Sequence, residues 1–285
     1  MSPEGRRGIA QSDRYGSPSW FERMGIRVGR WVGDGWLRRA LRSAFRRTLT
    51  WLTRGGPRSV LPNGEQVRLA PAYRFVTWNP VEYDAFRPCL AAGDTALDVG
   101  ANVGAYAVLF GLWVGERGRV VALEPAPDAF AGLRAHVVLN GLERVVEPVR
   151  AAASDRAGEA EFVSEGAQGT NHLAPAGPDG AARIRVPTTT IDMLCAERGL
   201  RPRLMKIDVE GAELAVLRGA RRTIAAMPPD GGLFVEMHPT TWATMGISAE
   251  DIRAELATQG LRAVPLRATD DPWAVDGECM RLERI

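Results

Sequence analysis

From residue 94 onward, short apolar runs rich in Val, Ile and Leu alternate with longer runs whose apolar residues recur at helical spacing. Strands that alternate with helices of this length build parallel βαβ units with right-handed crossovers. The expected strands are 95–99, 119–123, 145–150, 158–163, 204–209, 233–237, 261–266 and 278–283. The expected helices are 104–114, 127–139, 190–198, 212–226 and 248–259. This pattern predicts a doubly wound α/β sheet, which binds ligands beyond the carboxyl ends of its strands.

The start of the chain differs in composition from the rest. Residues 1–60 hold thirteen arginines against four acidic residues, whereas the whole chain has a formal net charge of only +2. Residues 1–19 are rich in Gly, Ser and Arg, a composition typical of disorder. Apolar residues recur at helical spacing over 37–52 with arginines between them, which predicts a basic amphipathic helix. We therefore expect a basic, partly disordered N-terminal helical extension over 1–57 and an α/β domain over 58–285.

Two connecting segments carry their own signals. Residues 58–80, in which Pro62-Asn63-Gly64 lies between short apolar stretches, predict a hairpin that leads into the α/β domain. Residues 164–182 are rich in Gly, Ala and Pro, and loops of that length inside compact domains are usually lids or flexible insertions.

Little in the sequence points to a membrane or to an oxidising compartment. The longest apolar run, 105–114, is too short to span a bilayer, and the first twenty residues lack the apolar core of a secretory signal. The three cysteines are far apart and suggest neither a disulfide framework nor a zinc site. We expect a cytoplasmic protein.

The turn after the first expected strand reads Asp98-Val-Gly100-Ala-Asn102-Val-Gly104. Its glycines allow a tight turn and a close approach of the backbone to a ligand, which would also suit a dinucleotide. Asp98 separates the cofactor classes, because its carboxylate would repel a pyrophosphate at the helix N-terminus and attract an ammonium. The glycine spacing also departs from the G-x-G-x-x-G dinucleotide pattern. S-adenosylmethionine carries an ammonium and a sulfonium and no phosphate, so we predict that it binds at Asp98, Gly100, Asn102 and Gly104.

The ends of the next two strands supply further candidates for cofactor binding. Glu124 ends the second strand, where an acidic side chain can accept hydrogen bonds from both ribose hydroxyls of either cofactor. Ala153 and Asp155 follow the third strand and are placed to meet the adenine edge. An equally weighted interpretation of Asp155 is a turn residue before Gly158.

A second cluster, Lys206-Ile-Asp208-Val-Glu-Gly-Ala-Glu213, passes from a strand into a helix, and Lys206 is the only lysine of the chain. Alternation places Lys206 and Asp208 on one face of the strand. Several ionisable groups at an apolar strand end are costly to bury unless they are paired, and such clusters favour a functional site. We predict that Lys206 and Asp208 are functional and that Glu213 stabilises the helix N-terminus.

Glu236 and His238 end the next strand, again on one face. Together with Asp208 they predict a general-base site, in which His238 takes a proton from a hydroxyl near neutral pH. A divalent cation held by these three residues is geometrically conceivable, but the sequence has no H-E-x-x-H pattern, so a metal is possible without being predicted. For Trp242, just beyond, ordinary packing is weighed at least as heavily as a wall of an acceptor pocket. His136 lies in the middle of a helix and is expected at the surface.

Taken together, the Asp98–Gly104 turn, Glu124-Pro125, Thr190-Ile-Asp192, the Lys206–Glu213 run and Glu236-Met-His238 resemble the FkbM family of methyltransferases over about residues 90–240. The resemblance implies a Rossmann-like class I methyltransferase fold, with seven strands of which the last is antiparallel. It implies O-methylation of a hydroxyl on a sugar or a natural product. It also implies that Asp98, Gly100, Asn102, Gly104 and Glu124 bind S-adenosylmethionine, and that Asp208 lies near the methyl group.

Three alternatives compete with this hypothesis. A nicotinamide-dependent oxidoreductase would need a first turn compatible with phosphate, which Asp98 opposes. A nucleic-acid methyltransferase would use the Arg-rich helix as a phosphate clamp, but that helix lacks an organised aromatic platform. Residues 37–52 could also rest on an anionic membrane surface, although packing of their apolar stripe on the domain is favoured. We expect a small-molecule or glycan acceptor with a free hydroxyl, and no nucleic-acid partner.

Overall fold

The structure is a computed structural model that describes residues 56, 58–71, 73, 76–164, 172–173, 182–267 and 271–285. The expected amphipathic helix at 37–52 lies outside the described residues. So does most of the expected 164–182 loop. In the part of the chain that is described, no helix has the length and apolar character needed to cross a membrane.

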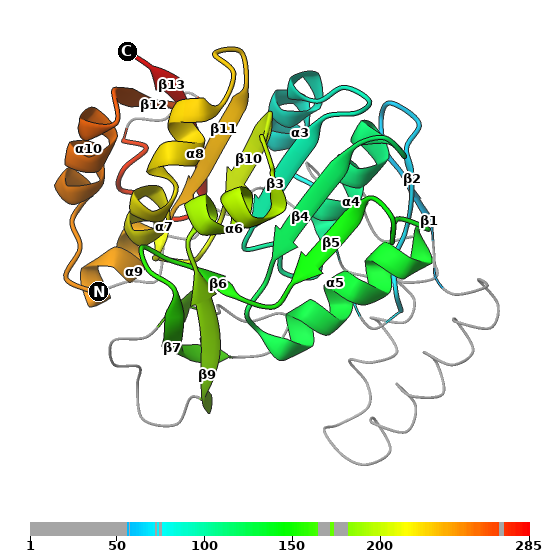
Figure 1. Ribbon diagram of the computed structural model, residues 1–285, viewed down its shortest axis with the longest axis horizontal. Coiled ribbons are helices and arrows are strands. Elements are labelled where there is room, and N and C mark those ends of the chain that lie inside the picture. The colour runs from blue at the N-terminus through cyan, green and yellow to red at the C-terminus, as the bar shows by residue number, and fades with distance from the viewer. Residues whose placement is uncertain are drawn as a thin grey trace, which may run out of the picture.

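A seven-stranded sheet forms the centre of the described structure (Figure 1). Its strand order is β12-β13-β11-β10-β3-β4-β5, and every pairing is parallel except those of β13 with its two neighbours. The strands are β3 (Thr95–Val99), β4 (Arg119–Leu123), β5 (Val146–Val149), β10 (Leu204–Ile207), β11 (Gly232–Met237), β12 (Leu261–Pro265) and β13 (Glu278–Arg284). The predicted doubly wound, Rossmann-like sheet with an antiparallel last strand is confirmed.

The order of the strands reverses between β3 and β10. From β3 the chain builds outward through β4 and β5, then returns to add β10 and β11 on the other side. In sheets of this kind, ligands bind beyond the carboxyl ends of the strands at such a switch point. The two motifs that follow β3 and β10 are therefore neighbours at the edge where a ligand is expected.

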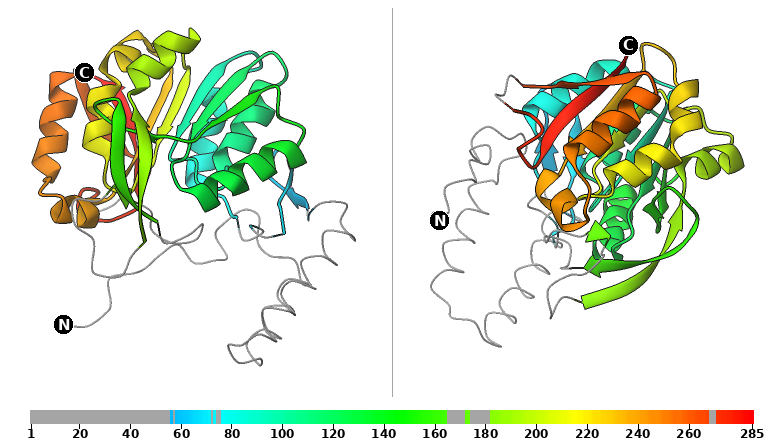
Figure 2. Two further views of the ribbon diagram at one scale, coloured as in Figure 1. Left: turned by 60° about the horizontal axis from the view of Figure 1, so that its bottom comes forward. Right: turned by 90° about the vertical axis from the view of Figure 1, so that its left-hand side faces the viewer.

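Helices cover both faces of the sheet (Figure 2). One face carries α3 (Pro80–Phe86), α4 (Ala105–Val114) and α5 (Pro127–Leu139), and the other carries α6 (Ile191–Arg198), α7 (Glu213–Gly219), α8 (Arg221–Ala226) and α10 (Ala249–Thr258). Leu97 and Val99 face the second group of helices, whereas Ala96 faces the first. Strand alternation therefore directs Asp98 and its strand neighbour Lys206 toward α3 and α4.

The expected hairpin is present as β1 (Arg58–Val60) paired antiparallel with β2 (Gln66–Arg68). Glu65 fastens it to α3 and α4, because its carboxylate accepts hydrogen bonds from the Tyr83 hydroxyl and, at 2.8 Å, from Trp113 Nε1. Tyr83 belongs to α3, a helix that the sequence analysis did not anticipate. Asn79 caps this helix by accepting a hydrogen bond from the Val81 amide.

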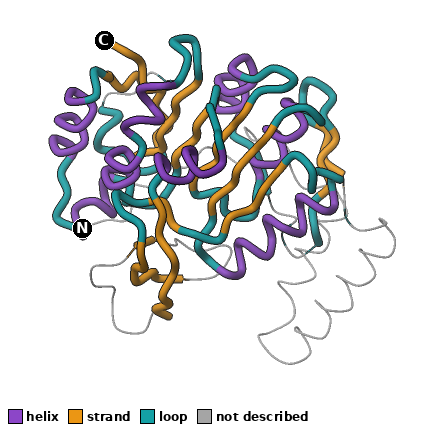
Figure 3. The backbone as a smooth tube through the Cα atoms, viewed as in Figure 1, coloured by secondary structure: helices purple, strands orange, loops and turns teal. Residues whose placement is uncertain are grey.

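A second sheet, of four strands, lies beyond the carboxyl ends of the central strands (Figure 3). Its order is β6-β9-β7-β8, with β6 (Ala152–Ala153), β7 (Gly158–Ser164), β8 (His172–Leu173) and β9 (Ala182–Thr189). Only its 158–163 strand was expected, and a loop was expected over 164–182. β6 places Ala152 and Ala153 at the edge of the switch point.

Two further expectations were wrong. The single helix expected over 212–226 is divided at Ala220 into α7 and α8, where Gly219 packs so closely on the Ser154 carbonyl that a Cβ atom would overlap it. His136, expected at the surface, is only 1% exposed. It lies one turn after the buried pair Gly132 and Leu133, and its Nδ1 is 2.6 Å from the Val103 carbonyl oxygen.

Candidate active site

The turn after β3 is shaped by three residues with positive φ, Gly100 (83°), Asn102 (49°) and Gly104 (86°). The Gly100 and Ala101 amides donate to the Leu123 carbonyl at 3.0 and 2.8 Å, which ties the turn to β4. A Cβ atom at Gly100 would overlap the carbonyl oxygen of Asp208, and the Asp208 amide donates to the Val99 carbonyl at 2.8 Å. The turns after β3 and β10 are thus in direct backbone contact.

A pocket of about 580 Å³, counting its open mouth, lies at this junction. It is lined by Gly100, Asn102, Leu123, Glu124, Pro125, Ala151, Ala152, Ala153, Phe162, Asp208, Val209, Glu210 and Ala212. The structure therefore brings together five of the predicted site residues, which are Gly100, Asn102, Glu124, Ala153 and Asp208.

Other predicted residues lie elsewhere. Gly104 does not line the pocket and instead starts α4 against Leu133. Asp155 is exposed on the turn before β7, with its Oδ1 atom 3.3 Å from the Ser154 hydroxyl and 4.0 Å from Arg156 Nε. This position agrees with the turn interpretation of Asp155.

Glu124 lines the pocket and is hydrogen-bonded to the backbone of the turns that follow β3 and β4. It is 5% exposed, and its two oxygens accept hydrogen bonds from the Asn102 and Ala126 amides, both at 2.8 Å. Burial raises the pKa of this carboxyl to about 7, although the two amide donors oppose the rise. Each oxygen retains a lone pair, so Glu124 can accept further hydrogen bonds from ligand hydroxyls.

Glu124→Gln is expected to remove a pH-dependent loss of stability. Because the pKa is raised from 4.5 to about 7, the folded state holds a proton that the unfolded state has released between those pH values. The free energy of unfolding should therefore fall as pH rises through this window, by about 3 kcal/mol in total. Urea unfolding of wild type and variant from pH 4.5 to 7.5 measures the difference in slope.

The control for this measurement is Glu147→Gln. Ion pairs with Arg119 and Arg198 lower the pKa of Glu147 despite partial burial, so its contribution is lost only as pH falls below the window. This variant should keep the wild-type slope. Equal slopes for the Glu124 variant and wild type would show that the Glu124 carboxyl is not perturbed by burial.

Asp98 lies beneath the turn and is only 1% exposed. In the described residues neither of its oxygens has a hydrogen-bond partner. Burial raises the pKa of Asp98 to about 6, offset in part by the Lys206 ammonium on the neighbouring strand. A buried carboxylate without a partner is costly, so this group is poised to receive a cationic ligand.

Lys206 lies between Asp98, its neighbour on the adjacent strand, and Asp208 in the turn after β10. It is 3% exposed, its Nζ donates to Asp208 Oδ2 at 2.8 Å, and it lies 5.3 Å from the centre of the Tyr106 ring. Burial opposes its charge, but the Asp208 and Asp98 carboxylates outweigh burial and raise the pKa of Lys206. The same ammonium holds the pKa of Asp208 below its usual range. Lys206 thus fixes Asp208 as an anion at the pocket wall.

His238 follows β11 and is held from behind by Glu213. Its Nδ1 lies 2.7 Å from Glu213 Oε1, and the other oxygen of Glu213 accepts a hydrogen bond from Trp242 Nε1. Glu213 is fully buried, so beyond the expected stabilisation of a helix N-terminus it orients His238. Trp242 is 1% exposed, as ordinary packing predicts.

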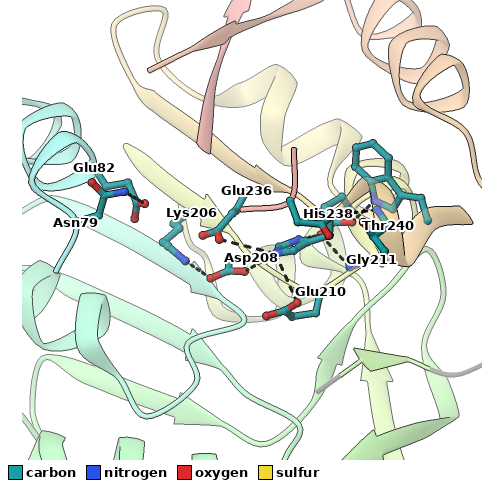
Figure 4. Close-up of polar contacts among 12 residues, drawn as sticks. Asn79, Glu82, Lys206, Asp208, Glu210, Gly211, Glu236, His238 and Thr240 are labelled. Carbon is teal, nitrogen blue, oxygen red and sulfur yellow. Dashed lines mark hydrogen bonds and ion pairs between the residues drawn. The ribbon is translucent and has the colours of Figure 1, made fainter. Parts of the chain in front are cut away.

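The free edge of the His238 ring faces three carboxylates (Figure 4). Nε2 lies 3.6 Å from Glu210 Oε2 and 3.8 Å from both Asp208 Oδ1 and Glu236 Oε1. Burial acts against protonation, but the hydrogen bond to Glu213 and the nearby carboxylates prevail and raise the pKa of His238 to about 10. This environment therefore does not favour the titration of His238 near neutral pH that the sequence suggested.

Eight of the thirteen described lining residues were not predicted from the sequence, and Glu210 and Phe162 are two of them. Glu210 lines the pocket with a positive φ of 52°, and its position directly before Gly211 was the available signal for a turn. Phe162 reaches the pocket from the second sheet, and the sequence analysis had no means of placing that sheet.

Comparison with solved structures gives similarities of low sequence identity. Methyltransferase FkbM from Methylobacillus flagellatus KT is 20% identical with a TM-score of 0.43, over 67% of this chain and 43% of that one. Aeropyrum pernix fibrillarin, solved with natively bound S-adenosylmethionine, is 16% identical with a TM-score of 0.43, over 79% and 92% of the two chains. The strand order establishes the fold independently of these similarities.

Comparison of sequences is more specific. The hexuronic acid methyltransferase AglP of Haloferax volcanii is 27% identical over 174 residues, 58% of this chain, and the chain spans only 64% of that relative's length. The family model of the methyltransferase FkbM domain matches residues 98–263, more than half of the chain. Because this match begins at Asp98 and runs through both strand-end clusters, the resemblance drawn from those motifs is confirmed, and the chain belongs to the FkbM methyltransferase family.

Proposed function

We propose that this protein transfers the methyl group of S-adenosylmethionine to a hydroxyl oxygen of a sugar or a related natural product. The observation that carries the proposal is the charge of the pocket. Among the described residues that line it, Glu124, Asp208 and Glu210 are acidic and none is basic. Such a wall disfavours the phosphates of a dinucleotide and suits a cationic cofactor without phosphate.

The residues present fit this cofactor. The unpartnered Asp98 carboxylate, which lies beneath the turn and outside the pocket lining, would attract its ammonium. Glu124 would accept hydrogen bonds from the ribose hydroxyls, and Ala153 would meet the adenine edge. Gly100 and Asn102, with their positive φ angles, keep the backbone of the turn close to the ligand.

When bound, the cofactor supplies an electrophilic methyl group, whose bond to sulfur breaks as the acceptor oxygen forms the new C–O bond, leaving a neutral thioether and a proton. The protein's main contribution is to hold the acceptor hydroxyl at near-attack distance. Of the two candidates for the proton acceptor, Asp208 lines the pocket, whereas His238 stands behind it. We therefore assign the proton to Asp208, which Lys206 holds in place.

The acceptor class is proposed from the relative. AglP acts on a hexuronic acid. A transfer screen with S-adenosylmethionine labelled in its methyl group, using hexuronic acids, neutral hexoses, polyketide-like alcohols and RNA, tests the assignment. Labelled methyl ether on a sugar or alcohol supports it. Labelled RNA, or NAD binding without S-adenosylmethionine binding, would overturn it.

Asp98→Asn is expected to weaken S-adenosylmethionine binding about 10- to 100-fold, because a charge-assisted hydrogen bond contributes about 1.5–3 kcal/mol. The variant should unfold no more easily than wild type, since it removes a buried charge that has no hydrogen-bond partner in the described structure. Calorimetry for affinity and urea unfolding for stability measure the two effects.

The matched control is Glu147→Gln on the same sheet. This carboxylate has Arg119 and Arg198 as partners, so the variant should lose some stability and keep its affinity for the cofactor. If Asp98→Asn behaved like this control, Asp98 would be a structural partner of Lys206 and not a cofactor ligand.

A further inference from the structure

The cluster around His238 contains an arrangement that methyl transfer alone does not explain. The ring is almost fully buried, with 6% of its side chain exposed, and Glu213 fixes its orientation through Nδ1. In the described part of the chain Nε2 has no hydrogen bond, although it points at Asp208, Glu210 and Glu236 (Figure 4). A buried ring nitrogen is thus aimed at three carboxylates that it does not touch.

The spacing of these atoms is that of ligands around one ion. Contacts of 3.6–3.8 Å are too long for a hydrogen bond, which needs about 2.7–3.2 Å. One ligand atom each from Asp208, Glu236 and His238 lie within 4.8 Å of one another. Ligands about 2.1 Å from a divalent ion are separated by about 3.0 Å at right angles and by about 4.2 Å across the ion. The three donors therefore surround a volume that one cation would fill with small adjustments.

The groups behind the donors also suit a metal site. A metal-bound histidine usually donates its other ring N–H to a carboxylate, which fixes the tautomer and leaves the second nitrogen as a ligand. The fully buried Glu213 is the carboxylate partner of His238 Nδ1. Lys206 binds Oδ2 of Asp208 and leaves Oδ1 directed at the cluster.

We propose that Asp208, Glu236 and His238 bind one divalent metal ion. Two carboxylates and one imidazole suit a first-row ion such as Mn²⁺ better than Ca²⁺ or Mg²⁺, which prefer oxygen ligands alone. Glu210, at 3.6 Å from Nε2, is a third carboxylate within reach and could serve as a fourth ligand. Because Asp208 also lines the pocket, the ion would lie beside the acceptor and lower the pKa of a coordinated hydroxyl. That consequence rests on the proposed function, whereas ion binding does not.

Mn²⁺ itself is the probe, added to the full chain without cofactor and followed by electron paramagnetic resonance. We expect one ion per chain with affinity in the micromolar range. His238→Gln, which keeps a donor for Glu213, and the near-isosteric Glu236→Gln should each weaken binding at least about tenfold, and Glu213→Gln about 10- to 100-fold. Glu250→Gln, at an exposed carboxylate at the start of α10, should bind as wild type does.

Two results would overturn the site. Wild type that binds no Mn²⁺ at millimolar concentration would show that His238 is only an imidazolium among carboxylates. Binding that survives both the His238 and Glu236 substitutions, in variants with wild-type circular dichroism, would place the ion elsewhere. Calorimetry with S-adenosylmethionine on the same preparations keeps the questions apart, because failure to bind the cofactor counts against the proposed function alone.

Discussion

Asp208→Asn is expected to lower kcat for methyl transfer at least about 100-fold, the usual loss when a positioned acid–base group is removed. The dissociation constant for S-adenosylmethionine should change little. The amide preserves the shape of the side chain and can still accept the Lys206 hydrogen bond, and the backbone bond from Asp208 to Val99 does not involve the side chain. What the variant loses is the anionic oxygen at the pocket wall, which is needed as proton acceptor or as metal ligand.

Glu210→Gln is the matched control for Asp208→Asn. Glu210 also lines the pocket and also faces His238 Nε2, at 3.6 Å. It lacks the buried lysine that fixes Asp208, so we expect its kcat to fall less than about tenfold. Both rates are measured with the acceptor that the screen identifies. Equal losses in the two variants would mean that only the summed negative charge of the wall matters, and that Asp208 has no specific part in transfer.

Much of the fold could be predicted because it depends on local pattern. The runs of β3, β4 and β11 are short, apolar and bounded by turn residues, and their expected limits differ from the observed ones by no more than one residue. The second sheet was harder. Ile184 and Val186 alternate with Arg183 and Arg185 in β9, a period-two signal that was present but lay next to a Gly-rich stretch.

The site was predictable where it follows directly from strand ends. Asn102, Glu124 and Asp208 each end or follow a parallel strand, so the topology alone brings them to one edge of the sheet. The pairing of Glu213 with His238 is of another kind, because it joins residues 25 positions apart through side chains from a helix and a strand end. No local pattern specifies which carboxylate an imidazole will meet.

The burial of Asp98 shows how the two parts of the site depend on each other. Its carboxylate has no hydrogen-bond partner in the described residues and is offset mainly by Lys206, which itself is held by Asp208. The Lys206 ammonium thus offsets the charge of two carboxylates, Asp98 beneath the turn after β3 and Asp208 at the pocket wall. A cationic cofactor would add the counter-charge that these two carboxylates lack, so cofactor binding should also stiffen Asp208.

Gly100→Ala is expected to have the largest effect on the fold of the site. The position combines a φ of 83° with a close approach in which a Cβ atom would overlap the Asp208 carbonyl oxygen. Positive φ alone costs an alanine about 1–2 kcal/mol. The overlap is with backbone atoms, so a rotamer change cannot relieve it. We expect it to lower the free energy of unfolding by about 1–3 kcal/mol more and to push the turns after β3 and β10 apart. S-adenosylmethionine binding should be lost with them.

Gly93→Ala separates these two causes. Gly93 has a φ of 95°, but no atom lies within 4 Å of a Cβ atom built there. Its variant should lose only the conformational part of the stability and should bind the cofactor as wild type does. The difference between the two variants in free energy of unfolding, measured by urea, therefore reports the contact between the β3 and β10 turns. If the two variants were equally stable and bound the cofactor equally, that contact would have no part in shaping the site, and the coupling of cofactor turn to transfer site would have to be abandoned.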